Sequence, residues 1–136
     1  MTVFVCVDDR GGMTFNSRRQ SRDERLIDDV LRHTGDSPLY VTDFSEELFE
    51  NTDACIISVP SPLDTSVTGA FVFIENLALL PHVDKIKTLV IYRWNRAYPY
   101  DTALDIDPLK HGFKAPRVTE FEGKSHKIIT KEVYER

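Results

Sequence analysis

The segment from Tyr92 to Tyr100 has the most unusual residue content of the chain. Its sequence, YRWNRAYPY, places four aromatic residues and two arginines within nine positions. Aromatic rings beside arginine and asparagine can stack on a planar heterocycle and bind its rim with hydrogen-bond donors. The same residue types also form the centre of homodimer interfaces, and such rings can hold a loop against the core. The sequence leaves these three roles open.

Arginines also gather in the first loop and at the start of the helix that follows it. They are Arg10, Arg18, Arg19, Arg22 and Arg25. Guanidinium groups bind phosphate or carboxylate in a bidentate manner, and an exposed helix N-terminus favours the same anions. The acidic residues of the same stretch are Asp8, Asp9, Asp23 and Glu24. A solvated loop with balanced charge is therefore the alternative to an anion site.

Other kinds of chemistry find little support in the spacing of polar residues. The four histidines lie far apart, the carboxylate pairs lack the spacing of a calcium loop, and the chain has no G-x-S-x-G, Walker or G-x-G-x-x-G motif. We therefore predict no metal site. Whether the protein is an enzyme stays open. If it is one, the candidate proton carriers are Asp8, Asp9 and Asp23.

Charge and length limit the class of protein. The 136 residues include 17 lysines and arginines and 22 aspartates and glutamates, which gives a formal charge of −5. This acidic balance argues against a general nucleic-acid coat. The length predicts one domain, 1–136, whose core needs neither disulfides nor a structural metal, and the alternation of strands and helices described below makes it an α/β domain. The apolar start is too short for a signal peptide or a membrane span, so we expect a cytoplasmic protein.

Apolar runs alternate with helical patterns along the chain. We predict strands at Thr2–Val7, Pro38–Thr42, Ala54–Val59, Ala70–Ile74 and Thr88–Trp94. Cys6 and Cys55 fall in two of these runs, so we expect both to be reduced core residues. Polar loops are expected at 8–20 and 60–69, and an irregular stretch at 95–112. Segments 118–122 and 127–134 predict a C-terminal antiparallel hairpin.

Three helices are expected between the strands. The first begins at a capping box formed by Ser21 and Glu24 and ends at Gly35. A brief helix through Phe49 follows, capped by Asp43 or Ser45, and Asn76 caps a third. The predicted architecture is a single, mostly parallel central sheet with flanking helices and a closing antiparallel hairpin.

This order of elements resembles the dihydrofolate-reductase-like superfamily. The run VCVDDRGGM at 5–13 is similar to the opening strand and glycine-containing active-site loop of these reductases. Segments 70–74 and 89–92 are similar to two of their later strands, Asp101-Thr102 to the D-T pair that follows the second of these, and 119–121 with 132–136 to their terminal hairpin. The resemblance implies that the first, fourth and fifth strands are parallel neighbours. Ligands of open α/β sheets bind at the carboxyl ends of such strands.

The chain departs from the family where the cofactor would bind. A glycine pair at the end of the fourth strand is replaced by Glu75-Asn76, and a basic residue at the second helix is replaced by Asp43. A glutamate would bring bulk and like charge against a phosphate. We therefore predict no cofactor and argue against NADPH. The resemblance makes Asp23 the candidate for the acid that protonates a pterin; the alternative is a carboxylate that stabilises the helix N-terminus.

The leading hypothesis is a small-molecule binding domain for a planar, anionic ligand. Its expected cleft would gather Asp8 and Asp9 with the ligand-binding residues Arg10, Asn16, Arg18, Arg19, Glu75, Tyr92, Arg93, Trp94 and Arg96. We expect an edge of the Trp94 ring to line that cleft. One alternative is a protein- or RNA-interaction module that uses the arginine-rich loop and Tyr92–Tyr100. Another is a divergent NADPH-dependent reductase.

Expectations about partners follow from the same features. A small planar ligand and a homodimer both fit the sequence, whereas neither a membrane nor nucleic acid is an expected partner. The chain also resembles short bacterial proteins that are sometimes called ribonuclease Z. It lacks the H-x-H-x-D-H zinc motif of true enzymes of that name, so we predict no such activity.

Overall fold

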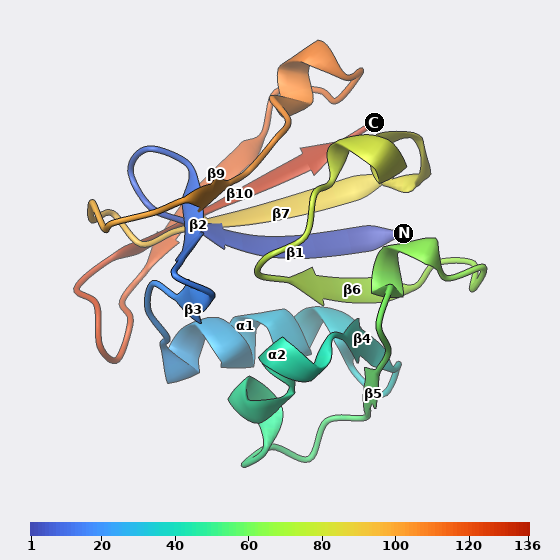
Figure 1. Cartoon of the computed structure of the whole chain (residues 1–136), viewed down its shortest axis with the longest axis horizontal. Coiled ribbons are helices and arrows are strands. Elements are labelled where there is room, and N and C mark those ends of the chain that lie inside the picture. Colours follow the sequence, from blue (N-terminus) through green and yellow to red (C-terminus); the bar gives the residue numbers. More distant parts are fainter.

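A seven-stranded sheet forms the centre of the computed structural model, which describes residues 1–136 (Figure 1). The strand order is β5-β4-β6-β1-β7-β10-β9. The five strands from β5 to β7 are parallel, whereas β10 runs antiparallel to β7 and β9 antiparallel to β10. The strands are β1 (Thr2–Val7), β4 (Leu39–Val41), β5 (Ile56–Ser58), β6 (Phe71–Ile74), β7 (Thr88–Arg93), β9 (Arg117–Phe121) and β10 (Ile129–Glu135). The mostly parallel sheet, the closing hairpin and the position of β1 between β6 and β7 are confirmed.

Both faces of this sheet are covered, which explains why β1 is apolar at nearly every position. Val3 and Val5 lie on one face in a core with Ile106, Phe113 and Val83 of the 3-10 helix η3 (Leu80–Lys85). Phe4 packs on the other face against the apolar stripe of α1 (Glu24–Thr34). Because the five strands from β5 to β7 are parallel, their carboxyl ends lie at one edge of the sheet.

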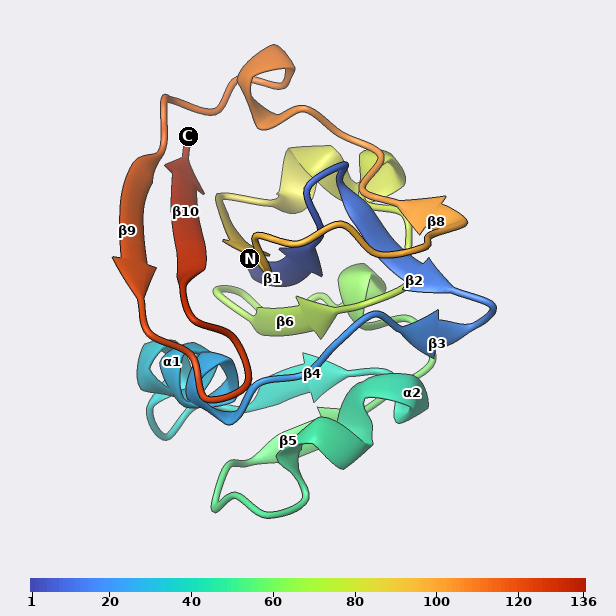
Figure 2. The same cartoon turned by 90° about the vertical axis from the view of Figure 1, so that its left-hand side faces the viewer.

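A second, three-stranded sheet lies at that edge (Figure 2). It consists of β3 (Arg18–Arg19), β2 (Gly12–Phe15) and β8 (Thr102–Ala103). The expectation of loops at 8–20 and 95–112 was wrong for these residues. Asn16 and Ser17, both with positive φ (51° and 61°), form the two-residue turn between β2 and β3. Turns of this kind match the twist of a hairpin.

Three helix predictions need correction. The N-cap of α1 is Asp23 instead of Ser21, because the Asp23 carboxylate accepts a hydrogen bond from the backbone N–H of Arg25. α2 (Asp43–Glu46) continues into the 3-10 helix η1 (Glu47–Phe49), and its N-cap residue, Thr42, makes no side-chain capping bond. The helix expected after Asn76 is the short η3, which contains Pro81. Two further 3-10 turns, η2 and η4, span Pro62–Asp64 and Pro108–Lys110.

The two cysteines differ from expectation as well. Both are free thiols, but Cys6 is only partly buried and Cys55 is exposed. Cys55 precedes the edge strand β5, which has one neighbour and is not covered like β1.

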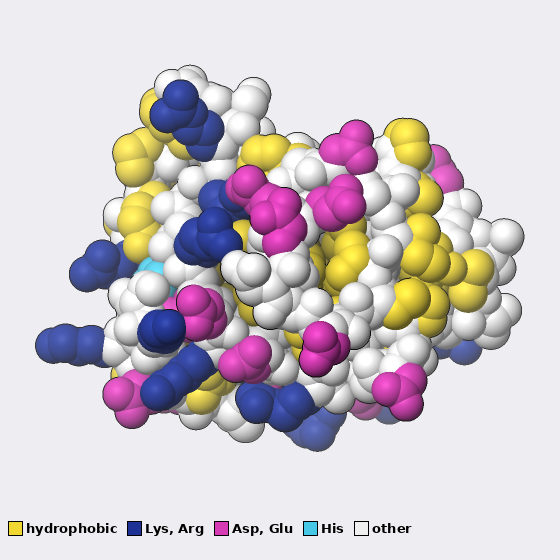
Figure 3. Space-filling view, turned by 90° about the horizontal axis from the view of Figure 1, so that it is seen from below, with side chains coloured by type: hydrophobic (Ala, Val, Ile, Leu, Met, Phe, Trp, Pro, Cys, Tyr) yellow, Lys and Arg dark blue, Asp and Glu magenta, His cyan; other side chains and the backbone are white.

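Seen from the side of α1 and α2, the surface carries interspersed acidic and basic side chains (Figure 3). None of the helices has the length and apolar character needed to cross a membrane.

Candidate functional site

A cleft of about 480 Å³ is lined by residues of both the arginine-rich first loop and the aromatic segment Tyr92–Tyr100. It lies between the β2–β3 hairpin and the start of the Tyr98–Tyr100 stretch. Its lining residues are Phe15, Asn16, Arg18, Arg19, Gln20, Tyr98 and Pro99. We call this the hairpin cleft. Phe15 is 41% exposed although it is a large hydrophobic side chain. Arg18 is exposed too, and it forms no salt bridge, whereas the neighbouring Arg19 forms two.

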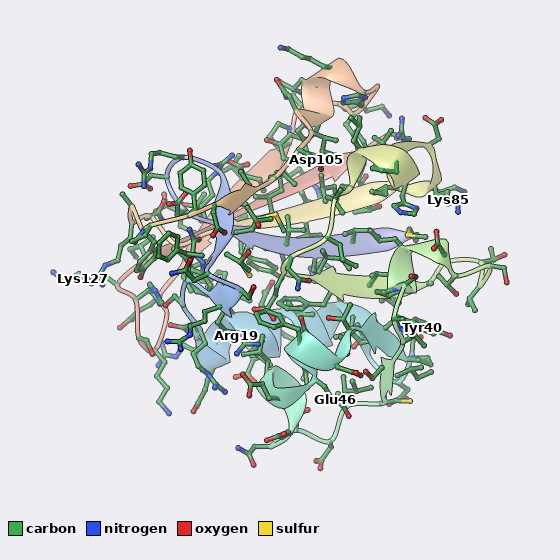
Figure 4. All side chains as sticks on the ribbon, in the orientation of Figure 1. Arg19, Tyr40, Glu46, Lys85, Asp105 and Lys127 are labelled. Carbon is green, nitrogen blue, oxygen red and sulfur yellow. The ribbon has the colours of Figure 1, made fainter.

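Arg19 extends from β3 toward α2 (Figure 4), and its charge is fully engaged. Its Nε and Nη2 donate to the two carboxylate oxygens of Glu75 at 2.9 and 3.1 Å, and Nη2 also donates to the Phe44 carbonyl at 2.7 Å. Nη1 binds Glu47. Although burial alone would lower the pKa of Arg19, the carboxylates of Glu75 and Glu47 hold it above its ordinary value. Arg19 is therefore not a free anion clamp.

Glu75 follows β6 directly and is 8% exposed. Besides Arg19, it accepts a hydrogen bond from Ser45 Oγ of α2 at 2.7 Å. The carboxyl end of β6 is thus filled by an ion pair between Arg19 and Glu75, two residues that we expected to bind a ligand.

Asp8 links the first loop to the aromatic segment. It is fully buried, and its carboxylate accepts hydrogen bonds from the backbone N–H groups of Arg10 (2.9 Å), Gly12 (2.7 Å) and Tyr98 (3.0 Å). Burial would raise the pKa of Asp8, but these donors hold it below the ordinary value. Both oxygens are therefore already occupied, and only Asp9 of this pair is exposed.

This arrangement predicts a pH-dependent contribution to stability. Because the pKa of Asp8 is lowered by folding from the ordinary 3.8, its contribution is present above that pH and is lost as the pH falls through the folded pKa. Asp8→Asn should reduce the free energy of unfolding by about 1–3 kcal/mol at about pH 7, and by less near pH 3. Urea unfolding at both pH values measures the difference, with the exposed Asp9→Asn as control. An equal loss at both pH values would contradict this role.

Asp23 makes a similar connection between α1 and the turn that joins β9 to β10. Its Oδ1 accepts from the N–H groups of Arg25 (2.9 Å) and Lys124 (3.0 Å), and its Oδ2 from those of Ser125 (2.7 Å) and His126 (3.2 Å). Burial would raise the pKa of Asp23, but these bonds and the His126 ring lower it. A Cβ at Gly123 would approach Asp23 Oδ2 to 2.7 Å, so only glycine fits there.

The ring of His126 lies in the same place, and no sequence motif connects it with the other residues. It stacks on Trp94 with a centroid distance of 4.6 Å and an angle of 28°. Its Nδ1 lies 3.1 Å from Asp23 Oδ2, and its Nε2 lies 3.0 Å from Ser21 Oγ and 3.3 Å from Tyr98 Oη. Ser21 and His126 are 105 positions apart, so only the fold brings them together.

Trp94 follows the carboxyl end of β7 as expected, but it does not line the hairpin cleft. It is 4% exposed and borders a separate hollow of about 290 Å³ together with Arg96 and residues 125–128. The expected single cleft is therefore divided, with Asn16, Arg18 and Arg19 in one part and Trp94 and Arg96 in the other.

Tyr92 and Arg93 were predicted to line the cleft, but both lie outside it. Tyr92 is fully buried and donates from its hydroxyl to Asp29 Oδ2 at 2.6 Å; burial and this carboxylate raise its pKa. Arg93 pairs with Glu132 of β10 at 2.8 Å. Neither side chain lines the hairpin cleft or the hollow beside Trp94. Consecutive residues of β7 point to opposite faces of the sheet, so the two side chains do not share a site.

Arg10, an exposed residue of the first loop, contacts the aromatic segment at Tyr98 and Tyr100. Its Nη2 donates to the Tyr98 carbonyl at 2.7 Å, and its guanidinium lies 4.9 Å from the centroid of the Tyr100 ring. A Cβ at Gly12 would meet Tyr100 at 2.6 Å, so the segment packs closely on the first loop. Loop anchoring is thus one use of these rings.

Comparison with known proteins gives one clear result. A solved structure of dihydrofolate reductase from Enterococcus faecalis, complexed with NADP(H) and RAB-propyl, superposes on 99% of this chain and 95% of its own, with a TM-score of 0.69 and 10% sequence identity. The chain has a dihydrofolate-reductase-like fold. No family model matches the sequence, and no curated protein matches it.

The chain shares the fold of that neighbour, and at 10% identity the likeness shows the fold alone. The comparisons give no support to the resemblance to proteins called ribonuclease Z. No three His, Cys, Asp or Glu side chains are grouped so that they could hold a metal ion.

Proposed function

We propose that the protein binds a small, planar, anionic ligand in the hairpin cleft. The observation that carries this proposal is Arg18, an exposed guanidinium without a salt bridge, in a cleft with the exposed ring of Phe15 and the ring of Tyr98. An aromatic ring offers a stacking surface, and a free guanidinium offers a bidentate anion site. Small-ligand binding also agrees with the fold, since the Enterococcus faecalis neighbour is complexed with small molecules.

The ligand in this proposal is not a nicotinamide dinucleotide. The carboxyl end of β6 is occupied by the Arg19–Glu75 pair, and Ser45 of α2 donates to the same carboxylate. A phosphate at that place would meet the Glu75 and Glu47 carboxylates and find the Arg19 guanidinium already neutralised. These contacts support a binding protein whose cofactor crevice has been closed by its own side chains.

Calorimetric titration with folate, flavin mononucleotide and NADPH tests the proposal. We expect one of the first two to bind and Arg18→Gln to weaken that binding by about 10- to 150-fold, which corresponds to one charge-assisted hydrogen-bonded contact. Arg22→Gln is the matched control, because Arg22 is also exposed and belongs to the same arginine-rich stretch but lies outside the hairpin cleft. It should leave the affinity unchanged.

The other outcomes each overturn the proposal. Tight binding of NADPH would favour a reductase. Binding of single-stranded RNA that weakens steeply with salt, and weakens equally in Arg18→Gln and Arg22→Gln, would favour an interaction surface. The absence of binding by every planar anion at millimolar concentration would remove the cleft hypothesis.

A further inference from the structure

Three side chains beyond the hairpin cleft form a continuous hydrogen-bonded chain. Asp23 contacts His126 Nδ1 at 3.1 Å, and His126 Nε2 contacts Ser21 Oγ at 3.0 Å. A carboxylate, an imidazole and a hydroxyl in this order are the parts of an activated serine nucleophile: the hydroxyl attacks, the imidazole takes its proton, and the carboxylate orients the imidazole.

The positions of the three groups are fixed before any substrate arrives. Asp23 is held by four backbone N–H groups, and the His126 ring is stacked on Trp94. Because Asp23 is ionised and can only accept, His126 Nδ1 carries the hydrogen. In the neutral ring, Nε2 then presents its lone pair to Ser21, which is the tautomer that a general base requires.

Ser21 is the accessible end of this chain. The side chains of Asp23 and His126 are buried, whereas Ser21 is partly exposed. Its hydroxyl is also free of the helix-capping role that the sequence predicted, because Asp23 caps α1 instead. The Tyr98 hydroxyl lies 3.3 Å from the same Nε2 that Ser21 contacts, so it is a donor near the reacting groups for an oxygen that becomes negative.

We propose that Ser21 is a nucleophile for small carboxylic esters, with His126 as its general base and Asp23 as the positioning residue. Ser21 Oγ attacks the carbonyl carbon while its proton passes to His126 Nε2. The carbonyl oxygen becomes the oxyanion and is bound by the Tyr98 hydroxyl. When the C=O bond re-forms, the bond to the leaving alcohol oxygen breaks, and His126 protonates that oxygen. Water, activated by His126, then releases the acid and restores Ser21.

Covalent labelling tests this site without knowledge of the natural substrate. A fluorophosphonate probe should modify the folded protein at Ser21, as located by peptide mass spectrometry. p-Nitrophenyl acetate should release one equivalent of p-nitrophenolate in a burst, and the intact mass should rise by one acetyl group. Ser21→Ala should abolish both signals. His126→Gln should slow labelling by about 100- to 10,000-fold, the usual contribution of a general base.

A matched control separates reactivity from exposure. Ser125→Ala removes an exposed hydroxyl beside His126 that makes no hydrogen bond, and it should leave labelling unchanged. If the natural protein shows no label at Ser21, or if Ser21→Ala reacts as fast as the natural protein, the nucleophile proposal is wrong. Circular dichroism of Ser21→Ala checks that its fold is retained. Tyr98 also lines the hairpin cleft, but the test does not require that cleft to bind a planar anion, since neither probe is one.

The positioning role of Asp23 has its own measurement. In Asp23→Asn, an amide NH₂ can face His126 Nδ1, which moves the ring hydrogen to Nε2 and removes the lone pair from Ser21. Nitrogen chemical shifts of the imidazole should report this change of tautomer, together with loss of labelling in a protein that is still folded. Unchanged shifts and an unchanged labelling rate would show that Asp23 only anchors the turn.

Discussion

Replacing Asp23 with alanine should lower the free energy of unfolding by about 3–5 kcal/mol. Asp23 is 3% exposed, and its carboxylate accepts hydrogen bonds from backbone N–H groups on both sides of a long-range contact. Alanine would remove the N-cap of α1, and it would leave donors of the 124–126 turn without acceptors. The expected loss is the free energy of the helix cap plus the larger cost of leaving the buried N–H groups of the turn without acceptors.

Urea unfolding measures this loss, and Glu24→Ala is its control. Glu24 is the next residue and pairs with Lys124 at 2.7 Å, but both side chains are mostly exposed (75% and 61%). An exposed pair of this kind contributes about 1 kcal/mol or less. If Asp23→Ala costs no more than Glu24→Ala, the carboxylate is not the anchor between the helix and the hairpin.

Replacing Arg19 with methionine should also cost about 3–5 kcal/mol, because it leaves the Glu75 carboxylate buried without its cation. The side chains of Arg19 and Glu75 are 15% and 8% exposed, and two hydrogen bonds connect them. Ser45 would remain as the only side-chain donor to Glu75, and one neutral hydroxyl does not compensate a buried charge.

The double variant Arg19→Met with Glu75→Gln distinguishes a buried charge from lost packing. If the cost comes from the unpaired carboxylate, the second change should restore part of the stability lost in the single variant. Arg18→Met is the control for the substitution itself, since Arg18 is exposed and forms no salt bridge, and it should change stability by about 0.5 kcal/mol or less. Additive losses in the double variant would contradict this account of the pair.

The sequence by itself determined the central layers of the fold. β1, β6 and β7 are continuous apolar runs, and α1 has an apolar stripe that ends at Gly35. Such periodicities are local properties of the chain, and burial on a covered sheet is what they encode. The order of these runs then limits the topology, because short connections and right-handed crossovers leave few arrangements.

The alternation of side chains along β7 already separates two residues that were predicted to share a cleft. Tyr92 and Arg93 were assigned to one cleft, but neighbouring residues of a strand point to opposite faces. Tyr92 shares its face with Val90 and packs toward α1, whereas Arg93 reaches Glu132. The hairpin turn needs positive φ at both Asn16 and Ser17, and neither residue type is specific for that backbone conformation. The sequence signal for the turn is therefore weaker than that of an Asn-Gly pair.

Only the tertiary structure decided which polar groups meet. Arg19 and Glu75 are 56 positions apart, and Ser21 and His126 are 105 apart. A charged or hydroxyl side chain on a loop can bind solvent, a ligand or another part of the chain at similar free energy, so its residue type does not select the partner. The selection is made by the packed sheet, which brings the carboxyl ends of β6 and β7 and the β9–β10 turn to one edge and places those particular atoms within hydrogen-bonding distance.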